Sequence, residues 1–183
     1  PKTLLSKCRH TPCYNWKEYL VMKRRLFMSL ATAAMLIGAG PRLAHADATI
    51  LTVNDLGRGT TTRFSDGDLA ALEQQSFETA TIWTDAVRSF SGPSLYTILE
   101  AAGAEPARLR IYAINDYNVE FPAEKITETT PILANRIDGE SFSVRQKGPL
   151  WVIFPFDQNP EFQSEEIFAL SVWQVKRIDV LTD

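Results

Sequence analysis

The side chains that most often carry chemistry are unevenly spread along this chain. Residues 47–183 have no cysteine, histidine or methionine, so they offer no thiolate nucleophile, no imidazole base and no soft metal ligand. What remains is carboxylates, hydroxyls, Tyr, Lys and Arg, which suit hydrogen bonding, ion pairing or an all-oxygen cation site. No calcium-loop spacing of carboxylates occurs, so we expect no metal site and assign no catalytic residue. The missing residue types all lie earlier in the chain, at Cys8, Cys13, His10, His45, Met22, Met28 and Met35.

Residues 22–46 have the pattern of a cleavable signal peptide. Residues 23–25 are a basic start, residues 26–40 are apolar or small, and Ala44-His45-Ala46 matches an A-x-A cleavage site. We therefore expect cleavage after Ala46 and a periplasmic or secreted protein without a stable membrane span. The sequence Arg24-Arg25-Leu26-Phe27-Met28 also resembles a twin-arginine export signal, so ordinary secretion and twin-arginine export both stay open.

Without this leader, residues 47–183 have the length of a single domain, and residues 1–21 are expected to be an unstructured upstream extension. The domain has 11 Lys and Arg side chains against 21 Asp and Glu, which gives a net charge of −10. An acidic surface repels nucleic acid and anionic lipid, so we exclude both as partners. The expected mature protein is therefore acidic and cysteine-free.

The elements that must position any functional side chain are mostly short strands. Two short helices are expected, one at 66–74 capped by Ser65, and one opened by 91–94 and ended at Gly103. The fold class is α+β with a mainly mixed or antiparallel sheet. Alternation and β-branched residues predict strands at 48–54, 60–64, 76–84, 109–114, 119–121, 131–137, 141–144, 150–154 and 169–181.

One stretch looks central to this sheet. Leu150–Phe154 is an unbroken apolar run between a Gly148-Pro149 turn signal and Pro155. Such a run is typical of a strand that is buried on both faces. We therefore predict that it is the central strand of the domain.

Four blocks of the chain carry a family resemblance: Phe90–Leu99, Asn115–Pro122, Leu133–Glu140 and Gly148–Pro155. They are similar, in the same order, to the patterns W-x-G-v-P-L-x-x-L-L, D-G-Y-x-x-x-x-P, L-A-x-x-x-D-G-x-P-L and G-x-P-L-R-L-v-x-P. These patterns belong to the molybdopterin-binding oxidoreductase domain of the sulfite oxidase type. The resemblance implies a small exported member of that family, with a sulfite oxidase-like fold that takes molybdopterin.

The resemblance also shows what this chain lacks. In the family a cysteine holds the molybdenum, and it occurs in a C-x-x-x-W pattern. If Trp83 is the tryptophan of that pattern, Thr79 occupies the position of the cysteine. If the position is instead counted back from Gly92, it falls on Ala80. A neutral hydroxyl does not replace a soft thiolate. We expect no bound cofactor, with molybdopterin as the alternative. The candidates for lining a cofactor pocket are Thr79, Trp83, Tyr117, Arg136 and Gly148.

Each candidate also has an ordinary structural explanation. Trp83 could fill the core, Tyr117 could be a half-exposed hairpin aromatic, and Arg136 could be a surface ion-pair partner rather than an anion ligand. The sequence alone does not decide between these explanations and a pocket.

We predict a periplasmic protein whose oxidoreductase-like domain binds a small molecule or a periplasmic protein without catalysis. One alternative is a molybdopterin-dependent oxidoreductase that works without a cysteine ligand; the missing Cys and His argue against it but leave enzymatic activity undecided. Another is an interaction protein that recruits a partner at a sheet edge, with Phe162 and Trp173 as its exposed aromatics, although Trp173 could also fill the core.

Overall fold

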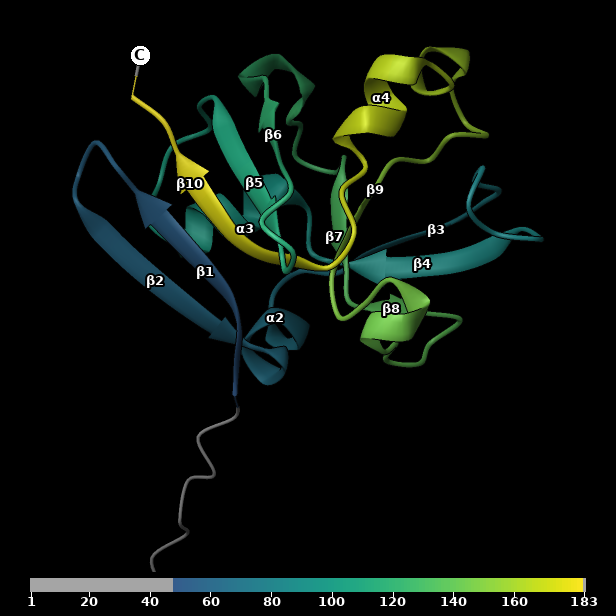
Figure 1. Cartoon of the computed structure of the whole chain (residues 1–183), viewed down its shortest axis with the longest axis horizontal. Helices are drawn as coiled ribbons and strands as arrows, with labels where there is room; N and C mark the ends of the chain where they lie inside the picture. Colours follow the sequence, from purple (N-terminus) through teal and green to yellow (C-terminus); the bar gives the residue numbers. More distant parts are fainter. Residues whose placement is uncertain (1–47, 183) are drawn as a thin grey trace, which may run out of the picture. The chain divides into compact units, whose positions relative to one another are not determined.

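The computed structural model describes residues 48–182, so the predicted extension, signal peptide and cleavage site lie outside the described part. A five-stranded sheet has the order β2-β1-β10-β5-β6 (Figure 1). Strands β1 and β10 are parallel and the other neighbours are antiparallel, which confirms an α+β fold with a mixed sheet. These strands are β1 Thr49–Asp55, β2 Thr60–Ser65, β5 Leu109–Ala113, β6 Asn118–Phe121 and β10 Val175–Val180.

The central strand of this sheet is β10, with two strands on either side of it. The prediction that Leu150–Phe154 is the central strand is therefore wrong. The run is buried as expected, but only Trp151–Ile153 forms a strand, β9, and it pairs with β7 (Ile132–Ala134) in a two-stranded sheet. Burial on both faces requires only that other elements cover a strand, so it does not reveal how many strands pair beside it.

A three-stranded sheet of order β3-β4-β8 completes the strands of the described residues. It consists of β3 Gln75–Thr79, β4 Arg88–Gly92 and β8 Arg136–Ile137. The strand predicted at 76–84 ends at Thr79, and the single strand predicted at 131–137 is divided between β7 and β8. Strand β4 was not predicted, because its alternating serines obscure the apolar pattern.

Two of the three α-helices in residues 48–182 follow the predicted signals. In α2 (Asp66–Ala71) the Ser65 hydroxyl accepts a hydrogen bond from the Asp68 N–H, and the Asp68 carboxylate accepts one from the Ser65 N–H, so the predicted capping box is confirmed. This helix ends before the predicted residue 74. Helix α3 (Leu95–Ala101) begins after Ser94, and Gly103 follows it with a positive φ of 72°.

The third described helix, α4 (Glu165–Leu170), was not predicted, and it includes the start of the strand that was predicted at 169–181. The strand predicted at 141–144 is also wrong, since only an isolated bridge between Ile137 and Glu140 forms there. Residues 48–182 also contain three 3₁₀ turns, η1 Ala123–Lys125, η2 Val144–Gln146 and η3 Pro160–Phe162.

A single hydrophobic cluster joins the three sheets and the helices. Helix α3 lies behind the five-stranded sheet in Figure 1, and its end contacts β2 where the Thr62 hydroxyl lies 3.5 Å from the Ala102 carbonyl oxygen. No helix among residues 48–182 is both long enough and apolar enough to cross a membrane.

Candidate functional site

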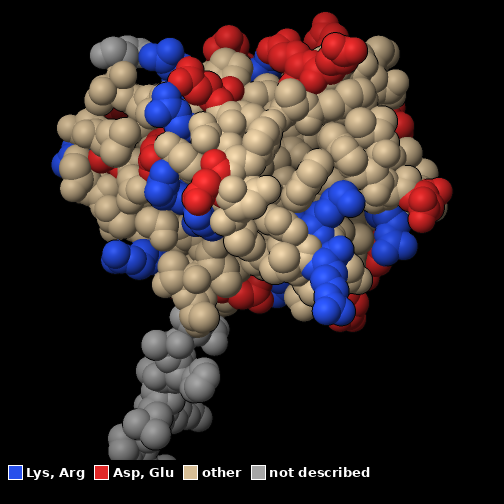
Figure 2. All heavy atoms as spheres, in the orientation of Figure 1, with Lys and Arg blue, Asp and Glu red and all other residues tan. Residues whose placement is uncertain are grey.

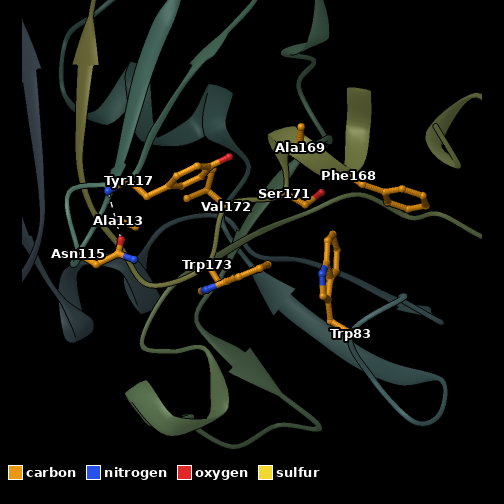
Figure 3. A pocket seen from close by; sticks show the side chains of 9 residues that line it. All are labelled: Trp83, Ala113, Asn115, Tyr117, Phe168, Ala169, Ser171, Val172 and Trp173. Atoms are coloured by element: carbon orange, nitrogen blue, oxygen red, sulfur yellow. Dashed lines mark hydrogen bonds between the residues drawn. The ribbon is translucent and has the colours of Figure 1, made fainter. Parts of the chain in front are cut away.

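An aromatic pocket of about 450 Å³ opens beside the start of β10. Its walls come from three places: the loop after β3, the β5–β6 turn, and the segment from the end of α4 to β10 (Figure 3). Of its nine described lining residues, four are aromatic and none carries a charge. They are Trp83, Ala113, Asn115, Tyr117, Phe168, Ala169, Ser171, Val172 and Trp173; we call this the aromatic pocket.

The back wall is held by backbone hydrogen bonds on both sides. The Val172 carbonyl accepts from the Val152 N–H of β9 at 2.9 Å, and the Gln174 carbonyl accepts from the Ile114 N–H of the β5–β6 turn at 2.9 Å. Trp173 lies between these two anchors and also forms an isolated bridge with Trp151. Trp173 therefore belongs to a fixed segment even though its side chain is 37% exposed.

Trp83 forms one side of the pocket and is half-buried. Its ring centroid lies 5.6 Å from that of Trp173 and 5.8 Å from that of Phe168, both in edge-to-face contacts. A further edge contact at 5.8 Å joins Trp83 to the buried Trp151. Aromatic pairs favour this geometry, so the rings hold one another at steep angles and form a corner rather than a flat stack.

Tyr117 faces Trp83 across the pocket (Figure 3) and comes from the tight β5–β6 turn. Asp116 adopts a left-handed conformation there, with φ 66°, and the Asn115 side-chain oxygen accepts a hydrogen bond from the Tyr117 N–H at 3.2 Å. The Asp116 carboxylate contacts the Lys176 ammonium at 2.7 Å. The turn is thus fixed by Asn115 and by the contact of Asp116 with Lys176 of β10, while Tyr117 itself is 53% exposed.

Two of the five predicted pocket residues, Trp83 and Tyr117, meet in the aromatic pocket, and Trp83 is not simply part of the core. Arg136 is instead an ion-pair partner: its guanidinium donates to both carboxylate oxygens of Asp66, at 2.8 and 2.7 Å. Gly148 is buried against Phe142, where a Cβ atom would lie 1.9 Å from the Phe142 carbonyl oxygen. Arg136 and Gly148 therefore connect elements and are not among the residues that line the aromatic pocket.

Thr79 is fully buried at the end of β3. Its hydroxyl lies 3.3 Å from an Asp157 carboxylate oxygen and 3.2 Å from the Ala80 carbonyl oxygen, while the Ala80 N–H donates to the same Asp157 side chain at 2.6 Å. This group ties β3 to the segment after β9. It does not line the aromatic pocket, whose described lining also has no Lys or Arg for a pterin phosphate, so the aromatic pocket does not fit a molybdopterin centre.

A second, polar pocket of about 500 Å³ lies on another side of Trp83. Its charged residues are partly paired with each other, because Arg88 contacts the Asp138 carboxylate at 3.0 Å. The Lys147 ammonium lies 6.0 Å from the Trp151 ring centroid, and both residues line this pocket. Among residues 48–182 no cluster of three or more Asp or Glu side chains could hold a metal ion.

Sequence reasoning missed several residues of the aromatic pocket. Phe168 and Ser171 were missed because α4 was not predicted, although Ser164 followed by two glutamates is an N-terminal helix signal. Asn115 was seen only as part of a turn. Trp173 was identified as an aromatic of interest, but for a sheet edge rather than for a pocket.

Neither the family models nor the curated proteins contain a match to this chain. The description of the protein as cysteine-free is wrong for the chain as a whole, because Cys8 and Cys13 are present; both lie outside the described residues.

Proposed function

We propose that residues 47–183 are a periplasmic, non-catalytic binding module with a sulfite oxidase-like molybdopterin-binding fold, and that the module binds a small organic molecule. The aromatic pocket is the observation that carries this proposal. Small-molecule sites are concave, mostly apolar, and hold a few polar groups that orient the ligand. The pocket has this composition, and its volume of about 450 Å³ is sufficient for a small organic molecule.

The polar groups of the pocket support binding better than catalysis. The Ser171 hydroxyl donates to the Ile167 carbonyl at 2.9 Å, and the Asn115 oxygen accepts from the Tyr117 N–H. No carboxylate, lysine or arginine is among the described lining residues, so no general base stands beside the serine. The side chains present can orient a ligand but supply no evident route for proton transfer.

The two alternative functions have less support. The Thr79 position is buried and satisfied by Asp157, which leaves an oxidoreductase without a residue to hold its metal. The aromatics considered for a sheet edge are also engaged elsewhere: Trp173 lines the pocket, and the Phe162 ring lies 5.5 Å from that of Phe154.

Binding can be tested with N-phenyl-1-naphthylamine, an uncharged dye that becomes fluorescent in apolar surroundings. The variant Ala169→Trp would fill the pocket from α4 without removing any existing contact, because Ala169 is exposed and lines the pocket. We expect it to weaken dye binding by about tenfold or more, since the new indole takes up ligand volume. The matched control is Ala70→Trp, a substitution of an exposed alanine on α2.

Fluorescence titration of the three proteins decides the matter. Wild type and Ala70→Trp should bind the dye equally, and only Ala169→Trp should lose it. If the wild type does not bind the dye, or if Ala169→Trp binds as well as the control, the pocket is not a ligand site.

A further inference from the structure

We infer that the ligand of the aromatic pocket is an organic cation of the quaternary ammonium class. This inference rests on the proposed function, since it names the chemistry of the molecule bound at the same site. Three features carry it: the arrangement of the rings, the distribution of charge around the pocket, and a cation that already lies against one of the rings.

The rings that line the pocket stand at steep angles to one another. The planes of Trp83 and Phe168 are 86° apart and those of Trp83 and Trp173 are 69° apart, so neighbouring walls meet at steep angles. Tyr117 and Trp83 stand on opposite sides of the pocket, with Trp173 between them (Figure 3). The face of an aromatic ring is electron-rich, and several such faces around one space attract a cation without needing hydrogen bonds.

The charges favour a cation over an anion. The described lining residues include no Lys or Arg, and residues 47–183 carry a net charge of −10. Helix α4, whose last turns supply Phe168 and Ala169, has Glu165 and Glu166 in its first turn. Figure 2 shows acidic side chains gathered over α4 at the upper edge of the molecule. A quaternary ammonium group has no N–H to donate, so it needs no hydrogen-bond acceptor in the pocket.

A cation of the protein already uses one ring of the pocket. The Lys147 ammonium lies 5.7 Å from the Trp173 centroid, within the range of a cation–π contact, although Lys147 lines the neighbouring polar pocket. The contact shows that the Trp173 indole is accessible to positive charge. It also means that Lys147 must repel a second cation, whereas the nearby Lys176 ammonium is paired with Asp116 at 2.7 Å.

The experiment compares choline with 3,3-dimethyl-1-butanol, which has the same shape but carries a carbon in place of the charged nitrogen. Calorimetric titration of the wild type should show choline binding about tenfold more tightly, because only choline gains cation–π attraction. The variant Lys147→Met should tighten choline binding by about threefold through loss of repulsion and leave the neutral alcohol unchanged. Ala169→Trp should weaken binding of choline.

The outcomes separate this inference from the proposed function. Equal affinity for the two molecules, or no choline binding by a protein that binds the uncharged dye, overturns the cation inference and leaves the binding module standing. Loss of dye binding as well overturns both. Choline binding that Lys147→Met leaves unchanged, or that persists in Ala169→Trp, would place the cation elsewhere and also overturn the inference.

Discussion

At the scale of single residues, the type of a side chain shows which chemistry is possible, whereas its environment shows which residues share a site. The absence of Cys, His and Met from residues 47–183 by itself excludes every mechanism that needs one of these side chains within the domain. Which aromatics share a pocket depends on contacts between distant segments, and the sequence could not show them. Trp83 and Trp173 are 90 positions apart, yet their ring centroids lie 5.6 Å apart.

Gly148 illustrates the same difference. The sequence marked it as part of a turn, but its role is to let the backbone pass close to Phe142. We expect Gly148→Ala to destabilise the domain by about 3 kcal/mol or more, because the added Cβ would overlap a backbone oxygen that cannot move away cheaply. Chemical denaturation measures the loss.

The matched control is Gly59→Ala, at a position with a positive φ of 66° and nothing within 4 Å of the added Cβ. This substitution should lower the free energy of unfolding by only about 1 kcal/mol, because it adds backbone strain alone. A Gly148→Ala protein as stable as this control would mean that the close approach to Phe142 is not a constraint.

At the scale of elements, local sequence signals were sufficient to predict those helices and strands whose ends and alternation are marked by their own residues. Strands β1, β2, β5 and β6 and helices α2 and α3 were expected near their observed places, because alternation, caps and Gly103 mark them. The failures concern partners in space. The pairing of β9 with β7 alone, and the polar strand β4 between two others, depend on long-range contacts that a local pattern does not encode.

The ion pair between Asp66 of α2 and Arg136 of β8 is such a long-range contact, and it has a pH signature. The hydrogen bonds from Arg136 hold the pKa of Asp66 below its ordinary value. Because the pKa of Asp66 is lower in the folded state, the ion pair stabilises the protein fully at pH values above the pKa of the unfolded state, which is about 3.9. This stabilisation is lost as the pH falls through the lower pKa of the folded state. Asp66→Asn should therefore cost about 0.5–1 kcal/mol at pH 7, since both side chains are partly exposed and solvent screens them.

Urea denaturation at several pH values tests this. The stability difference between wild type and Asp66→Asn should stay constant above about pH 5 and shrink toward zero near pH 2. The control Glu128→Gln, at an exposed site, should match the wild type throughout. A difference for Asp66→Asn that does not change with pH would show that the ion pair is not its cause.

At the scale of the whole described domain, the three sheets share one hydrophobic cluster. Strand β9 lies inside it, and through the segment that contains Trp173 it also supports the back wall of the aromatic pocket. The sequence thus correctly indicated that residues 150–154 are buried, although the strand belongs to a different sheet from the one expected. Folding and ligand binding should consequently be lost together when this strand is disturbed.

The variant Ile153→Asp tests that dependence. Ile153 is fully buried, and a carboxylate there would lie in the core without a partner, at a cost of several kcal/mol, which is comparable to the total stability of a domain this size. We expect no cooperative thermal unfolding, together with loss of the near-ultraviolet circular dichroism of the packed tryptophans and of dye binding. The matched control is Ile82→Asp, the same change at a side chain that is 66% exposed, which should unfold near the wild-type midpoint. Cooperative unfolding of Ile153→Asp near that midpoint would show that β9 is not needed by the common core.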